Sequence, residues 1–171
     1  MVMDRSKDAV RENNVDYMTD ERKMIQEVAR DFTMKEVLPV ANALDPVQGE
    51  IPMDLRRKMG EMGYFGIRIP EQYGGMGLGV FEYCLIAEEL SRGWMSVASI
   101  IARSTGVMAV EGWPLEKRLE LTSKAAKGEY LAAVSLSEPG AGSDLASVSC
   151  RAVLDGDEWV INGQKVWTSS G

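Results

Sequence analysis

The chain has 171 residues, 45% of them hydrophobic, and a formal net charge of −7, a composition typical of a soluble globular protein. Because it contains no histidine, it excludes Ser-His-Asp and Cys-His catalytic pairs, HExxH zinc sites and an imidazole base. Its 19 lysines and arginines are scattered among 26 acids, which argues against nucleic-acid binding, since that function needs clustered cations.

The cysteines, the N-terminus and the lengths of the apolar runs indicate in which cellular compartment the protein is found. Cys84 and Cys150 lie far apart and match neither a zinc spacing nor a CxxC redox pair, so we expect two buried free thiols and no metal site. The N-terminus lacks the apolar segment of a signal peptide, and no apolar run approaches the ~20 residues that a membrane span needs. The sequence therefore predicts a cytoplasmic protein.

Helical periodicity begins after a polar, flexible lead-in, residues 1–18. Five helices are predicted, with these starts and ends: N-cap Thr19 to Pro39, Pro52 to Gly63, residues 80–92, Met95 to about residue 110, and Pro114 to Gly128. The fourth is apolar almost all round, which is typical of a central helix in a bundle. Residues 68–79 form a glycine-rich loop between the second and third helices.

At Tyr130 the apolar pattern changes to period 2, which predicts strands at residues 130–137, 147–154, 158–161 and 165–169. Asp155-Gly156 and Asn162-Gly163 are hairpin signals. The predicted fold class is α+β: an N-terminal all-α helical bundle, residues 19–128, followed by an incomplete antiparallel β-barrel-like domain, residues 129–171. Because the last strand would leave an unpaired edge, we expect a fragment or a chain completed by another.

The strongest chemical signal is the segment Ser-Leu-Ser-Glu-Pro-Gly-Ala-Gly-Ser-Asp, residues 135–144. Its glycines allow the backbone to approach a ligand, successive N–H groups can bind an anion, and Ser143 adds a hydroxyl donor. The alternative is an ordinary glycine turn between strands. A dinucleotide-binding fold is excluded, because the third glycine is missing and a strand follows instead of a helix.

A second signal is Trp167, followed by hydroxyl groups at Thr168 and Ser169. This combination could pack against a flat aromatic cofactor and hydrogen-bond its edge. The alternative is a hairpin strand with a packed tryptophan. A third segment, the glycine-rich residues 72–79, is interpreted mainly as a connector between helices.

Taken in this order and spacing, the segments resemble the N-terminal half of the acyl-CoA dehydrogenase family. The matching segments are Ile-Pro-Glu-Gln-Tyr-Gly-Gly-Met-Gly at 69–77, Ala-Glu-Glu-Leu-Ser-Arg at 87–92, the segment at 136–144, and Gly-Asp-Glu-Trp-Val-Ile-Asn-Gly-Gln-Lys-Val-Trp at 156–167. The resemblance runs from about Tyr17 to Gly171. Family members are about twice as long, so it implies that residues 129–171 begin a middle β domain and that the C-terminal helical domain is absent here.

The resemblance implies FAD as cofactor, bound between the middle and C-terminal domains. The Leu136 backbone and Ser137 would hold the flavin pyrimidine edge, and Gly142 and Ser143 the pyrophosphate. The segment Trp167, Thr168 and Ser169 would flank the flavin. Threonine is more usual where Ser137 and Ser169 stand, but serine keeps the hydroxyl group.

The implied reaction is α,β-dehydrogenation of an acyl-CoA thioester, in which a carboxylate removes the α proton and the flavin accepts the β hydride. The family's base is a glutamate expected beyond Gly171, so this chain has no catalytic residue and is expected to be inactive alone. Glu138 borders the flavin loop, but we reject it as a substitute base and expect it to cap backbone N–H groups.

Substrate contacts implied by the resemblance are Ser143, Ala98, Ile101, Ala102 and Arg103. Arg103 could pair with a substrate carboxylate or sulfinate, or form a surface or interhelical salt bridge. Implied partners are acyl-CoA and an electron-transfer flavoprotein or another acceptor, and the full-length protein would be a homotetramer or homodimer. Two alternatives stay open: a non-catalytic remnant or partner subunit, and a relative with another flavin reaction, such as a monooxygenase or desulfinase.

Overall fold

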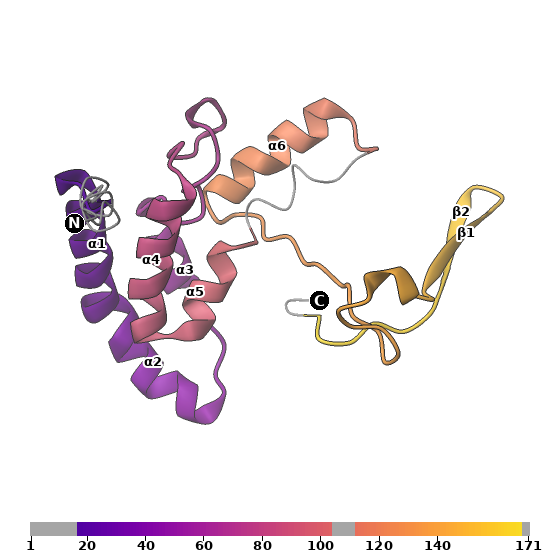
Figure 1. The fold of residues 1–171 in the computed structure, drawn as a ribbon, viewed down its shortest axis with the longest axis horizontal. Coiled ribbons are helices and arrows are strands. Elements are labelled where there is room, and N and C mark those ends of the chain that lie inside the picture. Colours follow the sequence, from indigo (N-terminus) through magenta and orange to yellow (C-terminus); the bar gives the residue numbers. More distant parts are fainter. Residues whose placement is uncertain (1–16, 104–111, 169–171) are drawn as a thin grey trace, which may run out of the picture. The chain divides into compact units, whose positions relative to one another are not determined.

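The computed structural model describes residues 17–103 and 112–168 (Figure 1). It divides into two compact units, one from Met1–Arg56 and Leu78–Ser99, the other from Arg57–Gly77 and Ile100–Gly171. Most of the predicted lead-in, the end of the predicted fourth helix and Ser169 lie outside the described residues.

Helices form the first part of the chain and a small antiparallel strand pair follows, which confirms the α+β class. The helices are α1 Asp20–Phe32, α2 Leu38–Leu44, α3 Met53–Glu61, α4 Val80–Gly93, α5 Met95–Ile101 and α6 Leu115–Ala126. The strands β1 Arg151–Asp155 and β2 Glu158–Asn162 pair around the predicted Asp155-Gly156 turn, with Asp155 opposite Glu158. Gly156 adopts the left-handed φ of 62° that this turn requires.

Predicted cap residues mark several helix ends correctly. The Thr19 hydroxyl accepts the Arg22 N–H at 3.3 Å and caps α1. Pro114 precedes α6, where its missing N–H costs nothing. Gly63 and Gly128, which follow α3 and α6, both have a positive φ, as expected for glycines that end helices.

The prediction that Pro39 ends the first helix is wrong. After α1 the backbone makes a π-helical turn, Thr33–Val37, and continues as α2 through the proline. A proline has no N–H to donate to the carbonyl four residues earlier, and its ring crowds that carbonyl. The wider π turn lies just before the ring, and there the Leu38 N–H bonds to the Thr33 carbonyl, five residues back.

The predicted fourth helix also ends early, at Ile101. The Arg103 N–H bonds to the Ile100 carbonyl at 3.2 Å, three residues back, so the last turn tightens before residue 104. Residues 104–110 of this prediction lie outside the described part of the chain. Both cysteines are free, as expected, but the prediction that both are buried is wrong: Cys84 is exposed and Cys150 is half-buried.

Three of the four predicted strands differ from the structure. Residues 130–137 and 165–168 are not assigned to strands, Leu145–Ser147 is a 3-10 turn, and the Asn162-Gly163 hairpin does not form. Alternating apolar residues favour extended backbone, but a strand also needs a neighbour to complete its hydrogen bonds. Within the described residues only β1 and β2 provide that pairing for each other.

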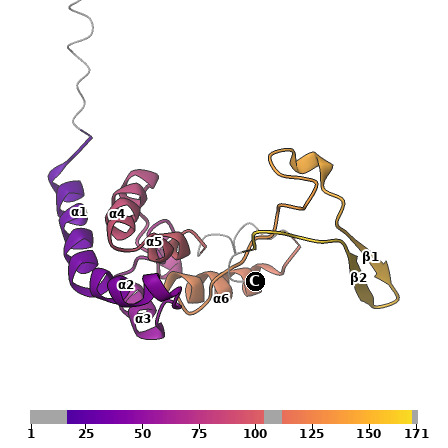
Figure 2. The same ribbon diagram turned by 90° about the horizontal axis from the view of Figure 1, so that it is seen from below.

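In the first unit, α1 and α4 lie side by side (Figures 1 and 2). They pack around a buried carboxylate. Glu89 of α4 is 0% exposed. Its oxygens accept hydrogen bonds from Gln26 Nε2 at 3.0 Å and from Arg30 Nη2 at 2.8 Å, both on α1. The Arg30 hydrogen bond lowers the pKa of Glu89, so the carboxylate stays charged and joins the two helices.

In the second unit, the glycine-rich loop is a closely packed turn. Gly77 donates to the Ile69 carbonyl at 2.9 Å, and Met76 donates to Gly66 at 2.8 Å. A Cβ atom on Gly75 would lie 2.0 Å from the Ile69 carbonyl oxygen. Glycine at position 75 is therefore required by packing within the loop itself.

No helix in residues 17–103 or 112–168 has the length and apolar character needed to cross a bilayer. The same residues contain no group of three or more Cys, Asp and Glu side chains arranged to hold a metal ion.

We expect Glu89→Ala to destabilise the first unit by about 2–3 kcal/mol, because Arg30 and Gln26 lose their buried acceptor. Urea unfolding of the 171-residue chain measures this change. The matched control is Glu88→Ala on the same helix, since the Glu88 side chain is exposed and lies 3.7 Å from Arg92; its effect should stay within about 0.5 kcal/mol. Equal losses in the two variants would contradict the assignment.

Candidate functional site

The candidate site is a tight turn in the second unit, residues 138–142. Glu138 and Ala141 close it by exchanging backbone hydrogen bonds, of 2.8 Å from the Glu138 N–H and 3.2 Å from the Ala141 N–H. Gly140, Gly142 and Ser143 are exposed, and among the described residues their N–H groups find no acceptor. Exposed backbone N–H groups gathered in one turn are able to bind an anion, and anion binding at this turn stays a prediction.

The two glycines of this turn are not required by the fold of the chain. Neither Gly140 nor Gly142 has a positive φ. A Cβ atom added to either would meet nothing within 4 Å, in contrast to Gly75. Space left at both positions fits the close approach of a ligand such as the FAD pyrophosphate to the backbone.

Glu138 holds this turn to two other segments. Its side chain is 4% exposed. The carboxylate accepts the Ser149 N–H at 2.7 Å, the Ser149 hydroxyl at 2.9 Å, the Cys150 N–H at 2.9 Å and Lys165 Nζ at 2.9 Å. The expected capping of backbone N–H groups by Glu138 is therefore confirmed.

Hydrogen bonds to the charged form set the acidity of Glu138. The Ser149 N–H contributes most, followed by Lys165 and the Cys150 N–H, and together they lower the pKa to about 2. Burial acts in the opposite direction but is outweighed. Glu138 therefore stays ionised in the folded protein at any ordinary pH.

The structure brings the two sequence signals together. The Val166 N–H donates to the Ser137 carbonyl at 3.0 Å, and the hydroxyl groups of Ser135 and Thr168 lie 2.6 Å apart. Residues 135–138 and 165–168 thus run next to each other. Leu136, Ser137 and Thr168, which the resemblance assigns to the flavin, belong to this pair of segments.

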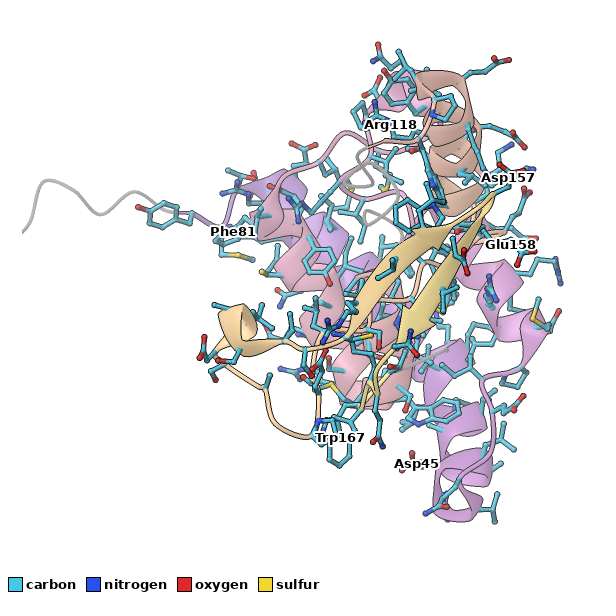
Figure 3. All side chains as sticks on the ribbon, turned by 90° about the vertical axis from the view of Figure 1, so that its right-hand side faces the viewer. Asp45, Phe81, Arg118, Asp157, Glu158 and Trp167 are labelled. Atoms are coloured by element: carbon cyan, nitrogen blue, oxygen red, sulfur yellow. The ribbon has the colours of Figure 1, made fainter. Side chains whose placement is uncertain are left out.

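Trp167 stands out at the end of the second segment. Its side chain is 90% exposed and extends from the ribbon (Figure 3). Its φ of 61° is in the left-handed region, which costs a residue other than glycine roughly 1–2 kcal/mol. An exposed indole on a strained backbone is a candidate surface for stacking a planar ring.

The predicted acyl contacts lie at the end of α5. Ala98 and Ile101 are one turn apart on that helix, and both are buried. Ala102 is exposed and Arg103 is half-buried in the turn that follows. Ser143 is exposed beside the glycine turn. Their roles toward a substrate remain predictions.

One surface hollow lies in the first unit, beside the start of α5, and its lining residue Met95 lies one turn before the predicted substrate residue Ala98. It has a volume of about 290 Å³ and is lined by Ala41, Asn42, Asp45, Pro46, Ser91, Gly93, Trp94, Met95 and Ser96. The charged side chain of this hollow, Asp45, already accepts a hydrogen bond from the Trp94 indole N–H, at 2.7 Å.

Sequence reasoning missed Lys165. This lysine donates to both the Leu136 carbonyl, at 3.0 Å, and the Glu138 carboxylate. A signal was present, because Lys165 is the only charged residue of its segment, residues 163–168. Its partners, however, lie 27 and 29 positions earlier, and pairing over such distances cannot be inferred from local spacing.

Known proteins match along almost the whole chain. Residues 19–135 match the family model "Acyl-CoA dehydrogenase, N-terminal domain", and residues 133–171 match "Acyl-CoA dehydrogenase, middle domain". The probable acyl-CoA dehydrogenase YngJ of Bacillus subtilis is 37% identical over 157 residues, covering 90% of this chain and 41% of YngJ.

Two solved structures are similar in fold as well as sequence. One is an acyl-CoA dehydrogenase complexed with FAD from Bacillus anthracis, with a TM-score of 0.76 and 33% identity over 89% of this chain and 27% of that one. The other comes from a structure named for the electron transferring flavoprotein of Acidaminococcus fermentans, with a TM-score of 0.77 and 32% identity over 90% and 41% of the two chains.

The chain spans less than half the length of YngJ and of both solved chains. Since the N-terminal family model alone covers well over half of its residues, this protein belongs to the acyl-CoA dehydrogenase family.

Proposed function

We propose that this chain supplies one wall of an FAD site in a protein that dehydrogenates an acyl-CoA thioester at its α and β carbons. The observation that carries the proposal is the turn at residues 138–142. Its exposed glycines, Gly140 and Gly142, are not needed by the fold itself, and their N–H groups find no acceptor among the described residues. FAD in the similar Bacillus anthracis structure supports the choice of ligand.

The proposed contacts follow the geometry of the two paired segments. Gly142 and Ser143 offer N–H groups and a hydroxyl to the pyrophosphate, while the Leu136–Ser137 peptide and the Ser137 hydroxyl face the pyrimidine edge. Trp167 and Thr168 flank the flavin, together with Ser169, which lies outside the described residues. When bound, FAD would supply the hydride-accepting chemistry, and these residues would orient it.

The proton in this reaction needs a base, and Glu138 is poorly suited to the task. Its carboxylate already accepts four hydrogen bonds, and its pKa of about 2 makes it a weak acceptor of a substrate proton. We therefore propose that the base lies outside residues 1–171, so that the chain alone does not turn over acyl-CoA.

The remaining assignments are part of the same proposal. Ala98, Ile101, Ala102 and Arg103 would contact the acyl group, with Arg103 suited to an acyl chain that carries a carboxylate. An electron-transfer flavoprotein would accept the electrons, and the whole protein would be a homodimer or homotetramer. The helical domain would span residues 19–128 and the start of the middle domain residues 129–171.

The direct test adds FAD to the purified 171-residue chain and follows quenching of flavin fluorescence and the visible flavin absorbance after gel filtration. Saturable binding with no reduction of the flavin by acyl-CoA is the expected result. A chain that leaves the column colourless at every FAD concentration would contradict the proposal and favour a remnant without flavin.

We expect Gly142→Ala to weaken FAD binding at least about tenfold, equivalent to about 1.4 kcal/mol, and to leave thermal unfolding unchanged, because the added methyl group meets only space meant for the ligand. Gly156→Ala in the β1–β2 turn is the matched control. It also meets nothing within 4 Å but requires a positive φ, so it should lower stability by about 1 kcal/mol and keep FAD affinity. Wild-type affinity in Gly142→Ala would argue against pyrophosphate at this turn.

The Glu138 carboxyl group should titrate with a midpoint near pH 2, against 4.5 for an unperturbed glutamate. Because its folded pKa is depressed, its hydrogen-bond network contributes fully to stability above about pH 4.5 and loses that contribution as the pH falls through 2. Carboxyl ¹³C NMR measures the midpoint, with the signal assigned by its loss in Glu138→Gln. A midpoint near 4.5 would show that the four hydrogen bonds do not persist in solution.

A further inference from the structure

Lys165 occupies the junction of the two segments that form the proposed FAD wall. Its ammonium group donates to the Leu136 carbonyl at 3.0 Å and to Glu138 Oε1 at 2.9 Å. The side chain is 27% exposed, against 4% for its partner Glu138. None of the contacts proposed above for FAD or substrate uses this lysine.

The peptide group between Leu136 and Ser137 is the part of the site that Lys165 touches. No described peptide bond is cis, so the Leu136 carbonyl and the Ser137 N–H point in opposite directions from one planar group. Lys165 holds the carbonyl side. The Ser137 N–H on the other side finds no acceptor among the described residues, although the carbonyl of Ser137 itself takes the Val166 N–H.

A charged donor on the carbonyl changes the N–H of the same peptide. Hydrogen bonds to charged groups are stronger than neutral ones, and bonds in a chain polarise one another. The ammonium of Lys165 therefore makes the Ser137 N–H a better donor as well as fixing its direction.

Glu138 keeps the lysine in this position. Its carboxylate is anchored by the N–H groups of Ser149 and Cys150 and by the Ser149 hydroxyl, so the oxygen facing Lys165 is fixed by contacts outside both segments. A lysine held only by a backbone carbonyl would sample other rotamers, since its four-carbon side chain is flexible.

We infer that Lys165 is a positioning residue for the proposed FAD site: held by Glu138, it orients and polarises the Leu136–Ser137 peptide so that the Ser137 N–H is presented to the flavin pyrimidine edge. This inference rests on the proposed function. A stronger donor at that edge favours the more negative, reduced form of the flavin, so Lys165 raises both FAD affinity and the reduction potential of the bound flavin.

The test compares Lys165→Met, which removes the charge and keeps an unbranched side chain, with Lys165→Arg, which keeps the charge. We expect Lys165→Met to weaken FAD binding at least about tenfold and to shift the potential of bound FAD to a more negative value, and Lys165→Arg to restore most of both. The matched control is Lys124→Met on α6, which removes an exposed lysine paired with Glu120 in the same unit and should behave as wild type.

Flavin fluorescence gives the affinity, and equilibration with a reference dye gives the potential. Wild-type values of both in Lys165→Met would overturn the inference and leave the proposed function standing. Absence of FAD binding by the wild-type chain would overturn the proposed function, and this inference with it. If Lys165→Met does not fold, Lys165→Gln decides: it keeps one donor without charge, so losses of the same sign support the inference and unchanged values overturn it.

Discussion

A single buried carboxylate organises the part of the chain that carries its chemistry. Glu138 accepts hydrogen bonds from the residues just before β1 and from the segment after β2, and its own backbone closes the glycine turn. Extended segments that lack a full ladder of backbone hydrogen bonds would otherwise have little to fix their register. Here the Glu138 carboxylate, which accepts four hydrogen bonds, fixes the register of these segments. The turn is therefore ordered although, among the described residues, only two short strands pair.

Local rules predicted the helical half of the chain well. Thr19, Pro114, Gly63 and Gly128 each act through their own backbone or side chain within one turn, so the sequence alone reveals them. The prediction at Pro39 is wrong because a proline ends a helix only where the preceding turn does not widen, and here a π turn at residues 33–37 lets the helix continue. Alternation of apolar residues predicted extended backbone after Tyr130, yet strand pairing is a property of two segments and cannot be obtained from one.

The candidate site also has features that the sequence reveals and features that only the structure shows. The glycine turn and Trp167 were visible as motifs because their residue types are unusual in that order. The sequence does not predict that residues 135–138 and 165–168 lie together or that Lys165 joins Leu136 to Glu138, since both depend on contacts between segments on either side of the β1–β2 hairpin. It also does not predict the left-handed backbone of Trp167, which residues other than glycine rarely adopt. The family resemblance implied roles for the glycine turn and Trp167 but none for Lys165.

The tryptophans of the two units differ in their exposure to solvent, so their fluorescence reports on the two units differently. Trp94 in the first unit is buried, and its indole N–H is bonded to Asp45, whereas in the second unit Trp113 is half-buried and Trp159 and Trp167 face solvent. A buried indole emits at shorter wavelength than a hydrated one, so Trp94 weights the blue edge of the emission toward the first unit, and Trp159 and Trp167 weight the red edge toward the second. Unfolding of the first unit and changes in the second can therefore be distinguished in one unlabelled sample.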